Sequence, residues 1–356
     1  MGTPFEYDTS TGNTPALAQI DSTHYLCAYE GPDFDGWAVV LIVDTDTWDV
    51  TKGTTFEYDT DNGVTPALAQ IDQTHYLCVY NGDKSSGLAV VLTVDTGNWT
   101  ISKEVPFEFD SQQGNTPALS KIDNGHYLCT YVDKFSDGWA FVLTIDTGNW
   151  TITKETPFEF EQNTALTPTL AKINDTHYLC AYEDKFSDGQ AFVLTVDTGN
   201  WTITKETPFE YDDIEALTPE LCKIDDSHYL CAYEGAGSDG WAVVLIVDIG
   251  TWNITKGMAF EYDTSDGQTP ALATIDDTRY LCAYGGNKSD GWATVLTVDT
   301  SSWTVSRGMG FEFDASTGIT PALSQIDPND YLCAYEGPGS DGWVVILNHT
   351  VAGIIP

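Results

Sequence analysis

Basic residues are scarce in this chain. Lysine and arginine together number 14 of 356 residues, whereas aspartate and glutamate number 54, so the formal net charge is −40. Nucleic-acid binding needs positive charge opposite the phosphates, so this composition excludes a nucleic-acid partner. The same sign of charge argues against an anionic membrane surface. Such acidity is typical of a soluble protein, a high-salt habitat or weak cation binding.

Long apolar runs are also absent. No segment approaches the ~18 consecutive apolar residues of a membrane-spanning helix, so we expect no membrane insertion. The first residues, Met1-Gly2-Thr3-Pro4, have neither the basic start nor the apolar core of a signal peptide. No stretch shows a convincing helical period. A hydrophobic content of 42% is nevertheless ample for a packed core.

The dominant feature of the sequence is a repeat of fixed length. The motif Tyr-Leu-Cys recurs at intervals of 51 residues without insertion or deletion, at Tyr25, Tyr76, Tyr127, Tyr178, Tyr229, Tyr280 and Tyr331. A period of about 40 to 50 residues with short strands is typical of a propeller. We therefore predict a single all-β domain over residues 1–356, a seven-bladed β-propeller with four antiparallel strands per blade.

One unit shows the expected order of strands from the axis outwards. We predict strands over residues 15–20, 24–30 and 37–43, and a polar outer strand over residues 48–59 that can break near Gly53. The innermost strand carries small side chains such as Ala16, as expected where strands converge. Large rings must fill the wedge between blades, and the Trp48 and Phe5 series are the candidates.

The position of the termini predicts how the ring closes. Pro356 falls in the repeat slot of Val50, and Met1 falls in that of Lys52, so both ends belong to one outer strand. Residues 3–8 should therefore complete the blade formed mainly by residues 321–356. Such closure removes an exposed strand edge.

Seven of the eight cysteines occupy one slot of the repeat. Rotation between blades should hold them apart, so we expect small, buried, unpaired thiols. Cys222 is the extra cysteine, and it lies across a predicted hairpin from Cys231. A disulfide between these two cysteines is therefore one alternative. Mostly unpaired cysteine favours a reducing compartment.

The unit resembles β-propeller repeats along the whole chain. The turn from Asp44 to Trp48 is similar to the turn between the third and fourth strands of kelch and quinoprotein-type propellers, although the kelch Gly-Gly pair is missing. The near-identity of the units resembles that of several lectin propellers in pattern. The resemblance implies the architecture and does not identify one family.

The longer loops share one face of the predicted propeller, and they carry acidic and aromatic residues together. A ring can stack on the CH face of a sugar while carboxylates accept from its hydroxyls, so this face suits carbohydrate. The complete set of Glu, Asp and Trp survives in units one, five and seven, which predicts three strong sites and two weaker ones. The predicted ligand-binding residues are Glu30, Asp35, Trp37, Asp137, Trp139, Glu234, Asp239, Trp241, Asp290, Trp292, Glu336, Asp341 and Trp343.

A structural alternative stands beside this interpretation. Trp37 begins an apolar strand and could simply pack between blades. Leu88 in the same slot of unit two fits this alternative, because leucine fills a core. Gln190 in unit four fits it poorly.

Metal sites have little support in the sequence. The loop Asp33-Phe34-Asp35-Gly36 offers two carboxylates, so structural Ca²⁺ in some loops is one expectation, but no loop has alternating Asp spacing. The histidines of the series that begins at His24 lie one blade apart, which is too far for two of them to share an ion. We interpret them as polar residues of the rim. We expect no other cofactor.

Catalysis needs different residues at one point, whereas sevenfold repetition disperses identical ones. The mouth of the central channel is the exception, because the copies approach each other there. Glu220 stands where other units have Ala16 or Thr169, and Asp213 and Glu215 make the neighbouring loop acidic. A carboxylate pair in this sector could act as a glycosidase.

These observations predict a monomeric, non-enzymatic, multivalent binding protein with glycan as its ligand. The alternatives are a scaffold that docks a protein or peptide, and a glycosidase-like enzyme at the acidic sector. The lectin interpretation favours an extracellular or cell-surface location, against which the unpaired cysteines stand, so localisation stays open.

Overall fold

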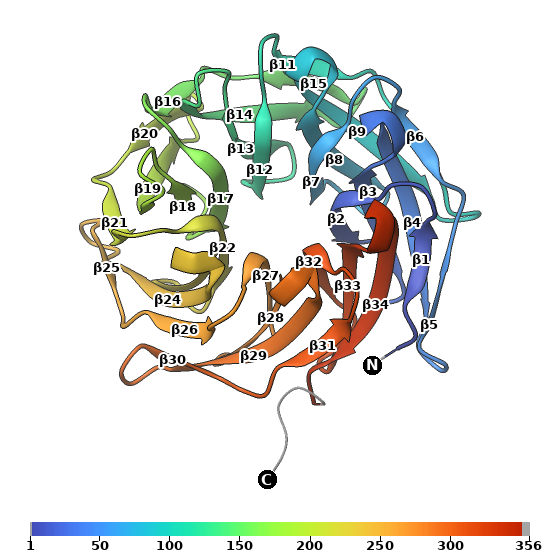
Figure 1. Cartoon of the computed structure of the whole chain (residues 1–356). Helices are drawn as coiled ribbons and strands as arrows, with labels where there is room; N and C mark the ends of the chain where they lie inside the picture. Colours follow the sequence, from blue (N-terminus) through green and yellow to red (C-terminus); the bar gives the residue numbers. More distant parts are fainter. Residues whose placement is uncertain (1, 351–356) are drawn as a thin grey trace.

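The chain forms a closed ring of seven small sheets around a central axis (Figure 1). The computed structural model describes residues 2–350. Strands run antiparallel from the axis to the rim in every sheet, as blade 1 illustrates with β2 (Asn13–Gln19), β3 (His24–Glu30), β4 (Gly36–Asp44), β5 (Asp49–Lys52) and β6 (Phe56–Asp59). The predicted seven-bladed, all-β propeller is confirmed.

The other blades repeat this arrangement with little variation. The innermost strands are β7 (Val64–Gln70), β12 (Asn115–Lys121), β17 (Leu166–Lys172), β22 (Leu217–Lys223), β27 (Gln268–Thr274) and β32 (Ile319–Gln325). The second strands are β8 (His75–Asn81), β13 (His126–Val132), β18 (His177–Glu183), β23 (His228–Glu234), β28 (Arg279–Gly285) and β33 (Asp330–Glu336). The third strands are β9 (Gly87–Asp95), β14 (Gly138–Asp146), β19 (Gly189–Asp197), β24 (Gly240–Val247), β29 (Gly291–Asp299) and β34 (Gly342–Asn348).

The outer strand of each complete blade is broken into two segments that both pair with the third strand. The first segments are β10 (Thr100–Lys103), β15 (Thr151–Lys154), β20 (Thr202–Lys205), β25 (Ile254–Lys256) and β30 (Thr304–Arg307). The second segments are β11 (Phe107–Asp110), β16 (Phe158–Glu161), β21 (Phe209–Asp212), β26 (Phe260–Asp263) and β31 (Phe311–Asp314). In blade 1 the break falls around Gly53, as predicted. The loops between second and third strands contain the 3-10 turns η1 (Pro32–Phe34), η2 (Asp83–Ser85), η3 (Ala236–Ser238), η4 (Asn287–Ser289) and η5 (Pro338–Ser340).

The last blade is closed by the start of the chain. The strand β1 (Phe5–Asp8) pairs with β34, with Phe5 opposite Val344 (Figure 1). The Gly2 amide donates to the Ile346 carbonyl at 2.9 Å and extends the contact. Closure by the N-terminal strand is therefore confirmed, whereas the predicted meeting of Met1 and Pro356 lies outside the described residues.

The hydrophobic core lies between blades rather than within them. Each cluster joins two neighbouring sheets, as where Tyr25 and Val39 of blade 1 pack with Leu332 and Val344 of blade 7. The fully buried rings are mainly tyrosines of the Tyr7, Tyr25 and Tyr29 series, together with Phe141 and Phe192. The Trp48 and Phe5 series contribute to the wedge as predicted, but only in part, since these rings are half-buried and pack against the clusters that the tyrosines fill.

Polar contacts join the blades at the outer side of every junction. The Tyr29 hydroxyl of blade 1 donates to Asp8 of the preceding blade at 2.8 Å. The same bond recurs at every junction at 2.8–3.2 Å, from Tyr80, Tyr131, Tyr182, Tyr233, Tyr284 and Tyr335. Lys52 adds a bond to the Tyr7 carbonyl across the same junction.

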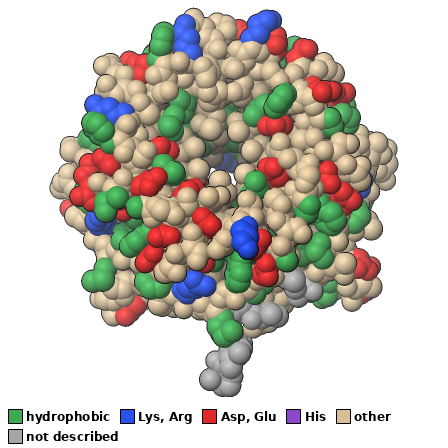
Figure 2. Space-filling view, viewed as in Figure 1, with side chains coloured by type: hydrophobic (Ala, Val, Ile, Leu, Met, Phe, Trp, Pro, Cys, Tyr) green, Lys and Arg blue, Asp and Glu red, His purple; other side chains and the backbone are tan. Residues whose placement is uncertain are grey.

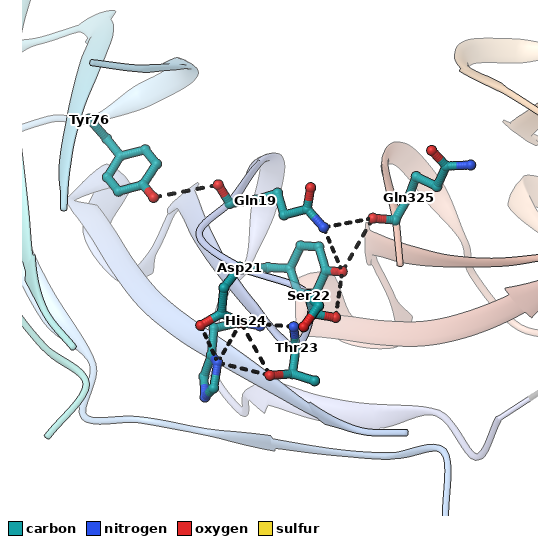
Figure 3. Close-up of polar contacts among 8 residues, drawn as sticks. Gln19, Asp21, Ser22, Thr23, His24, Tyr76 and Gln325 are labelled. Carbon is teal, nitrogen blue, oxygen red and sulfur yellow. Dashed lines mark hydrogen bonds and ion pairs between the residues drawn. The ribbon is translucent and has the colours of Figure 1, made fainter. Parts of the chain in front are cut away.

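Contacts at the opposite, inner end complete each junction. The Gln19 side chain donates to the Gln325 carbonyl at 3.3 Å, and Tyr76 donates to the Gln19 carbonyl at 3.4 Å (Figure 3). The Tyr25 hydroxyl also donates to the Gln325 carbonyl, at 3.2 Å. The His24 ring bonds to Asp21 and stacks on Trp99 of the next blade, with 3.6 Å between ring centroids. The histidines of the first five blades are thus inter-blade contacts rather than the simple polar rim that we expected.

Removal of β1 tests how much the closure contributes to stability. Deleting residues 1–8 opens one junction and exposes the apolar surface that Tyr7 covers, so we expect a loss of about 3 kcal/mol or more and a clearly lower melting temperature. Calorimetry of the truncated chain measures this loss. Deletion of residues 1–3 alone, which spares β1, is the control; equal melting temperatures for the two truncations would contradict the assignment.

Candidate functional site

The innermost strands enclose a central channel with a cavity of about 480 Å³. Each strand carries a β-bulge at its Thr-Pro pair: Asn13 pairs with Glu30 and Ala16 with Ala28, and the register shifts between them. Proline cannot donate to the strand ladder, so the bulge is where it fits. The repeated Thr-Pro motif therefore shapes the wall of the channel.

The threonines of these bulges are held in a strained conformation. All seven, from Thr14 to Thr320, have φ between 42° and 48°, a left-handed region that β-branched residues rarely adopt. Blades 6 and 7 are joined here by a hydrogen bond from the Thr320 amide to Thr269 Oγ1 at 3.2 Å. Such strain persists only where packing enforces it, so the channel wall is rigid.

Glu220 breaks the symmetry of the channel. Within residues 2–350 it is the one carboxylic acid among the channel-lining residues, which are otherwise Thr, Pro, Ala and Leu. Thr169 of the preceding blade donates its hydroxyl to Glu220 Oε2 at 3.4 Å. Burial raises the pKa of Glu220 to about 7, and the Thr169 bond only partly opposes this shift. Glu220 therefore changes charge near neutral pH.

Further acidic groups lie in the same sector of the ring. Burial raises the pKa of Glu183, and the carboxylates of Glu215 and Glu234 add to the effect. The pKa of Glu234 is likewise raised by burial and by Glu215. Figure 2 shows the central opening with acidic side chains distributed over the face around it. Anions that approach this face meet repulsion.

The two carboxylates expected of a glycosidase are not both present in the channel. Asp213 and Glu215 belong to the loop between β21 and β22, and neither lines the cavity around Glu220. A glycosidase needs two carboxyl groups across the scissile bond. Sequence comparison between the units did single out Glu220, but its pKa depends on burial that only the fold reveals.

The tryptophans predicted to bind sugar lie against glycine instead. A Cβ added to Gly31 would come within 2.2 Å of the Trp37 ring, so the ring rests directly on this loop. The same contact places Leu88 on Gly82 and Trp241 on Gly235. It recurs at Trp292 and Trp343, with Gly286 and Gly337 beneath them. A half-buried ring in this position is part of the packing.

The acidic partners of these rings point to different places. Glu30 is buried and accepts a bond from Asn13 on the innermost strand at 3.2 Å. Asp35 lies beside Glu57, which is on the outer strand. Burial and the neighbouring Asp35 carboxyl raise the pKa of Glu57. Glu30 is therefore held towards the innermost strand, whereas Asp35 and Trp37 share the neighbour Glu57 on the outer strand. Glu336 accepts a hydrogen bond from a serine of its own loop. Glu234 likewise has a serine of its own loop beside it.

Blades 3 and 4 explain the exceptional Gln190. In these blades Asp133 and Asp184 occupy the glycine slot, so a ring cannot lie on the loop there. Trp139 instead donates its Nε1 to Asp133 Oδ2 at 3.2 Å. Gln190 takes the ring's place in blade 4 and donates to Glu210 at 3.2 Å. Where Asp replaces the glycine, the residue in the ring slot thus bonds to a carboxylate instead, which sequence reasoning missed although both slots were visible in the repeat.

The described residues contain neither a metal-binding cluster nor a membrane-spanning helix. Residues 2–350 hold no group of three or more His, Cys, Asp or Glu side chains arranged to bind a metal ion. The expectation of structural calcium stays a prediction. Within the same residues no helix has the length and apolarity to cross a membrane. All eight cysteines are free, and Cys222 lies 3.2 Å from Thr274 Oγ1 rather than bonded to Cys231.

No family model and no curated protein matches the chain. Solved structures do match its fold. The Pseudomonas aeruginosa periplasmic gluconolactonase PpgL gives a TM-score of 0.66 at 14% identity, over 85% of this chain and 86% of that one. A Bacteroides fragilis protein assigned as a 6-phosphogluconolactonase gives 0.65 at 13% identity, over 85% of each chain. Saccharomyces cerevisiae Sqt1 gives 0.59 at 10% identity, over 94% of this chain and 82% of that one.

These findings correct the predicted lectin function. The rings that were expected to stack on sugars are packed on loop backbone in blades 1, 5, 6 and 7. The similar structures described above include two lactonases by name and no lectin. Identities of 10–14% show a shared fold and nothing more.

The pKa of Glu220 has a consequence for stability. The pKa of Glu220 is about 7 in the folded chain and 4.5 ordinarily. The contribution of this carboxyl to the free energy of unfolding is therefore complete below pH 4.5 and is lost as the pH rises through 7. We expect Glu220→Gln to be the more stable protein at pH 8, by up to about 3 kcal/mol, and to lose this advantage near pH 4.5. Denaturant unfolding at both pH values measures the difference. The exposed Glu108→Gln is the control; a pH-independent difference for Glu220→Gln would contradict the assignment.

Proposed function

We propose that the chain is a hydrolase that opens lactone rings in its central channel, with Glu220 as general base. The observation that carries the proposal is the single carboxyl that breaks the symmetry of the channel and titrates near neutral pH. A general base works best when its pKa lies near the operating pH. Lactonases by name among the proteins of similar fold support this choice of reaction.

The chemistry requires only water and one carboxylate. Glu220 takes a proton from water as the water oxygen bonds to the lactone carbonyl carbon. The tetrahedral intermediate then collapses, the ring carbon–oxygen bond breaks, and Glu220 returns the proton to the departing alkoxide. The product is a hydroxy acid, and the carboxylate is regenerated. Thr169 orients the carboxyl through its hydroxyl.

The channel suits a small uncharged substrate. Its cavity of about 480 Å³ lies within the usual range for small-molecule sites. Its described lining contains no lysine or arginine, and Glu183, Glu215 and Glu234 lie near one another in one sector of the ring. A phosphate group has no cation to meet there. We therefore propose neutral lactones rather than phosphorylated ones as substrates.

Substitution of the general base tests the proposed reaction. With a neutral six-membered sugar lactone, the rate of the unaltered chain should rise as the pH passes through about 7, because Glu220 must be ionised to act. Glu220→Gln should lower kcat by about 10²- to 10⁴-fold. A pH-stat assay measures both effects. Glu108→Gln should keep full activity; a fully active Glu220→Gln would refute the proposal.

Comparison of two substrates tests the proposed selectivity. The kcat/KM for the neutral lactone should exceed that for its 6-phosphate by about tenfold or more at low salt. Added salt should narrow the gap, because it screens the acidic rim. Steady-state kinetics at two ionic strengths measure this ratio. Preference for the phosphorylated lactone would contradict the electrostatic argument while leaving the role of Glu220 intact.

A further inference from the structure

The ring has a second cavity, away from the central channel. A pocket of about 410 Å³ opens on blade 3, between its loop after β13 and the outer strand β11 of the preceding sheet. Aromatic side chains form much of its wall: Phe109, Tyr131, Phe135 and Trp139. This pocket lies outside the central channel and shares no lining residue with it.

The pocket exists because of the substitution at the glycine slot. Asp133 carries a Cβ where Gly31 has none, so the Trp139 ring cannot settle onto the loop backbone as Trp37 does. Its Nε1 is instead fixed by Asp133 Oδ2 at 3.2 Å. The tryptophan therefore lines the cavity while it also packs against the core between blades 2 and 3.

Hydrogen bonds hold the other polar groups of the wall. The Tyr131 hydroxyl donates to Asp110 Oδ2 at 2.9 Å, so its polar tip is satisfied. Phe135 is 67% exposed at the loop tip. Phe186 is similarly exposed in the same repeat slot and Phe34 in the next one, so an exposed ring is a feature of this loop, and in blade 3 it is accessible to a molecule in the pocket.

The charges of the wall itself balance, because Asp110 and Asp133 stand against Lys134 and Lys154, and further carboxylates lie beside the pocket. The pKa of Asp137 is raised by burial and then by the carboxylates of Asp133, Glu159 and Glu161, which crowd the same area. The chain as a whole carries a net charge of −40. Cations of the chain itself already lie on the aromatic rings, with Lys134 Nζ 4.7 Å from the Phe135 centroid and Lys154 Nζ 5.6 Å from that of Tyr131.

We propose that the blade 3 pocket binds an organic cation of the quaternary ammonium class. Aromatic faces attract such cations through the ring quadrupole, and they do so without the hydrogen bonds that a quaternary ammonium cannot make. Asp110 and Asp133 supply the balancing negative charge at the wall. Lys134 and Lys154 are the internal competitors, because they lie on the Phe135 and Tyr131 rings.

Blade 4 provides an internal control for this proposal. Its loop repeats the sequence Asp-Lys-Phe-Ser-Asp-Gly, but Gln190 replaces the tryptophan. The corresponding cavity is smaller, about 230 Å³, and its wall contains one aromatic residue, Tyr182. The other blades keep the glycine or lack the ring. One site per chain is therefore expected, and it is independent of the proposed hydrolase.

Calorimetric titration of the full chain with tetramethylammonium chloride at constant ionic strength tests the proposal. We expect one site per chain, and binding of tert-butanol, a neutral molecule of similar size, at least tenfold weaker. Trp139→Gln should reduce tetramethylammonium affinity at least tenfold, and Lys134→Ala should increase it. Gln190→Trp should raise the stoichiometry from one to two.

Two controls separate loss of the site from loss of the fold. Phe135→Ala removes an exposed ring, so it should weaken binding at least fivefold with an unchanged melting curve. Trp292→Gln alters a ring packed on Gly286 and should leave binding unchanged. Equal affinities for tert-butanol and tetramethylammonium would overturn the proposal. So would tetramethylammonium binding that is undiminished in both Trp139→Gln and Phe135→Ala.

Discussion

The junction between neighbouring blades is the interaction on which the rest of the structure depends. A single blade cannot bury its apolar faces, and the tyrosines of the Tyr7, Tyr25 and Tyr29 series become buried only when two sheets meet. Burial of these rings contributes most of the packing energy, and the recurring Tyr-to-Asp bond fixes the angle at which the sheets approach. Because the same junction repeats around the circle, its angle determines the number of blades and the width of the channel.

Repetition of this kind stabilises a fold but works against chemistry. Identical residues are carried to seven equivalent places, and a reaction needs unlike groups at one place. Function should therefore lie where a copy departs from the others. Glu220 is such a departure inside the channel, and Asp133 with Trp139 is another at the rim. In each case the departure adds a group that packing does not require.

Most of the architecture could be predicted from the repeat alone. The 51-residue period gave the number of blades, and the repeat slots of the first residues gave the closing strand β1. The identity of the buried rings could not be predicted, since alternation along a strand does not say which ring faces a neighbouring blade. Trp48 illustrates this: it lies in a turn with φ of 60°, a conformation that sequence pattern does not reveal for tryptophan.

The candidate sites were only partly visible in the sequence. Comparison between units identified Glu220, but the burial that raises its pKa belongs to the assembled channel. Trp37 looked like a sugar platform because its contact with Gly31 is a tertiary one. The central claim, that one carboxyl in the channel is poised near neutrality, is tested most directly by carbon NMR titration of the side-chain carboxyls. One resonance should titrate near pH 7 and vanish in Glu220→Gln; titration of every carboxyl below about pH 5 would contradict the account.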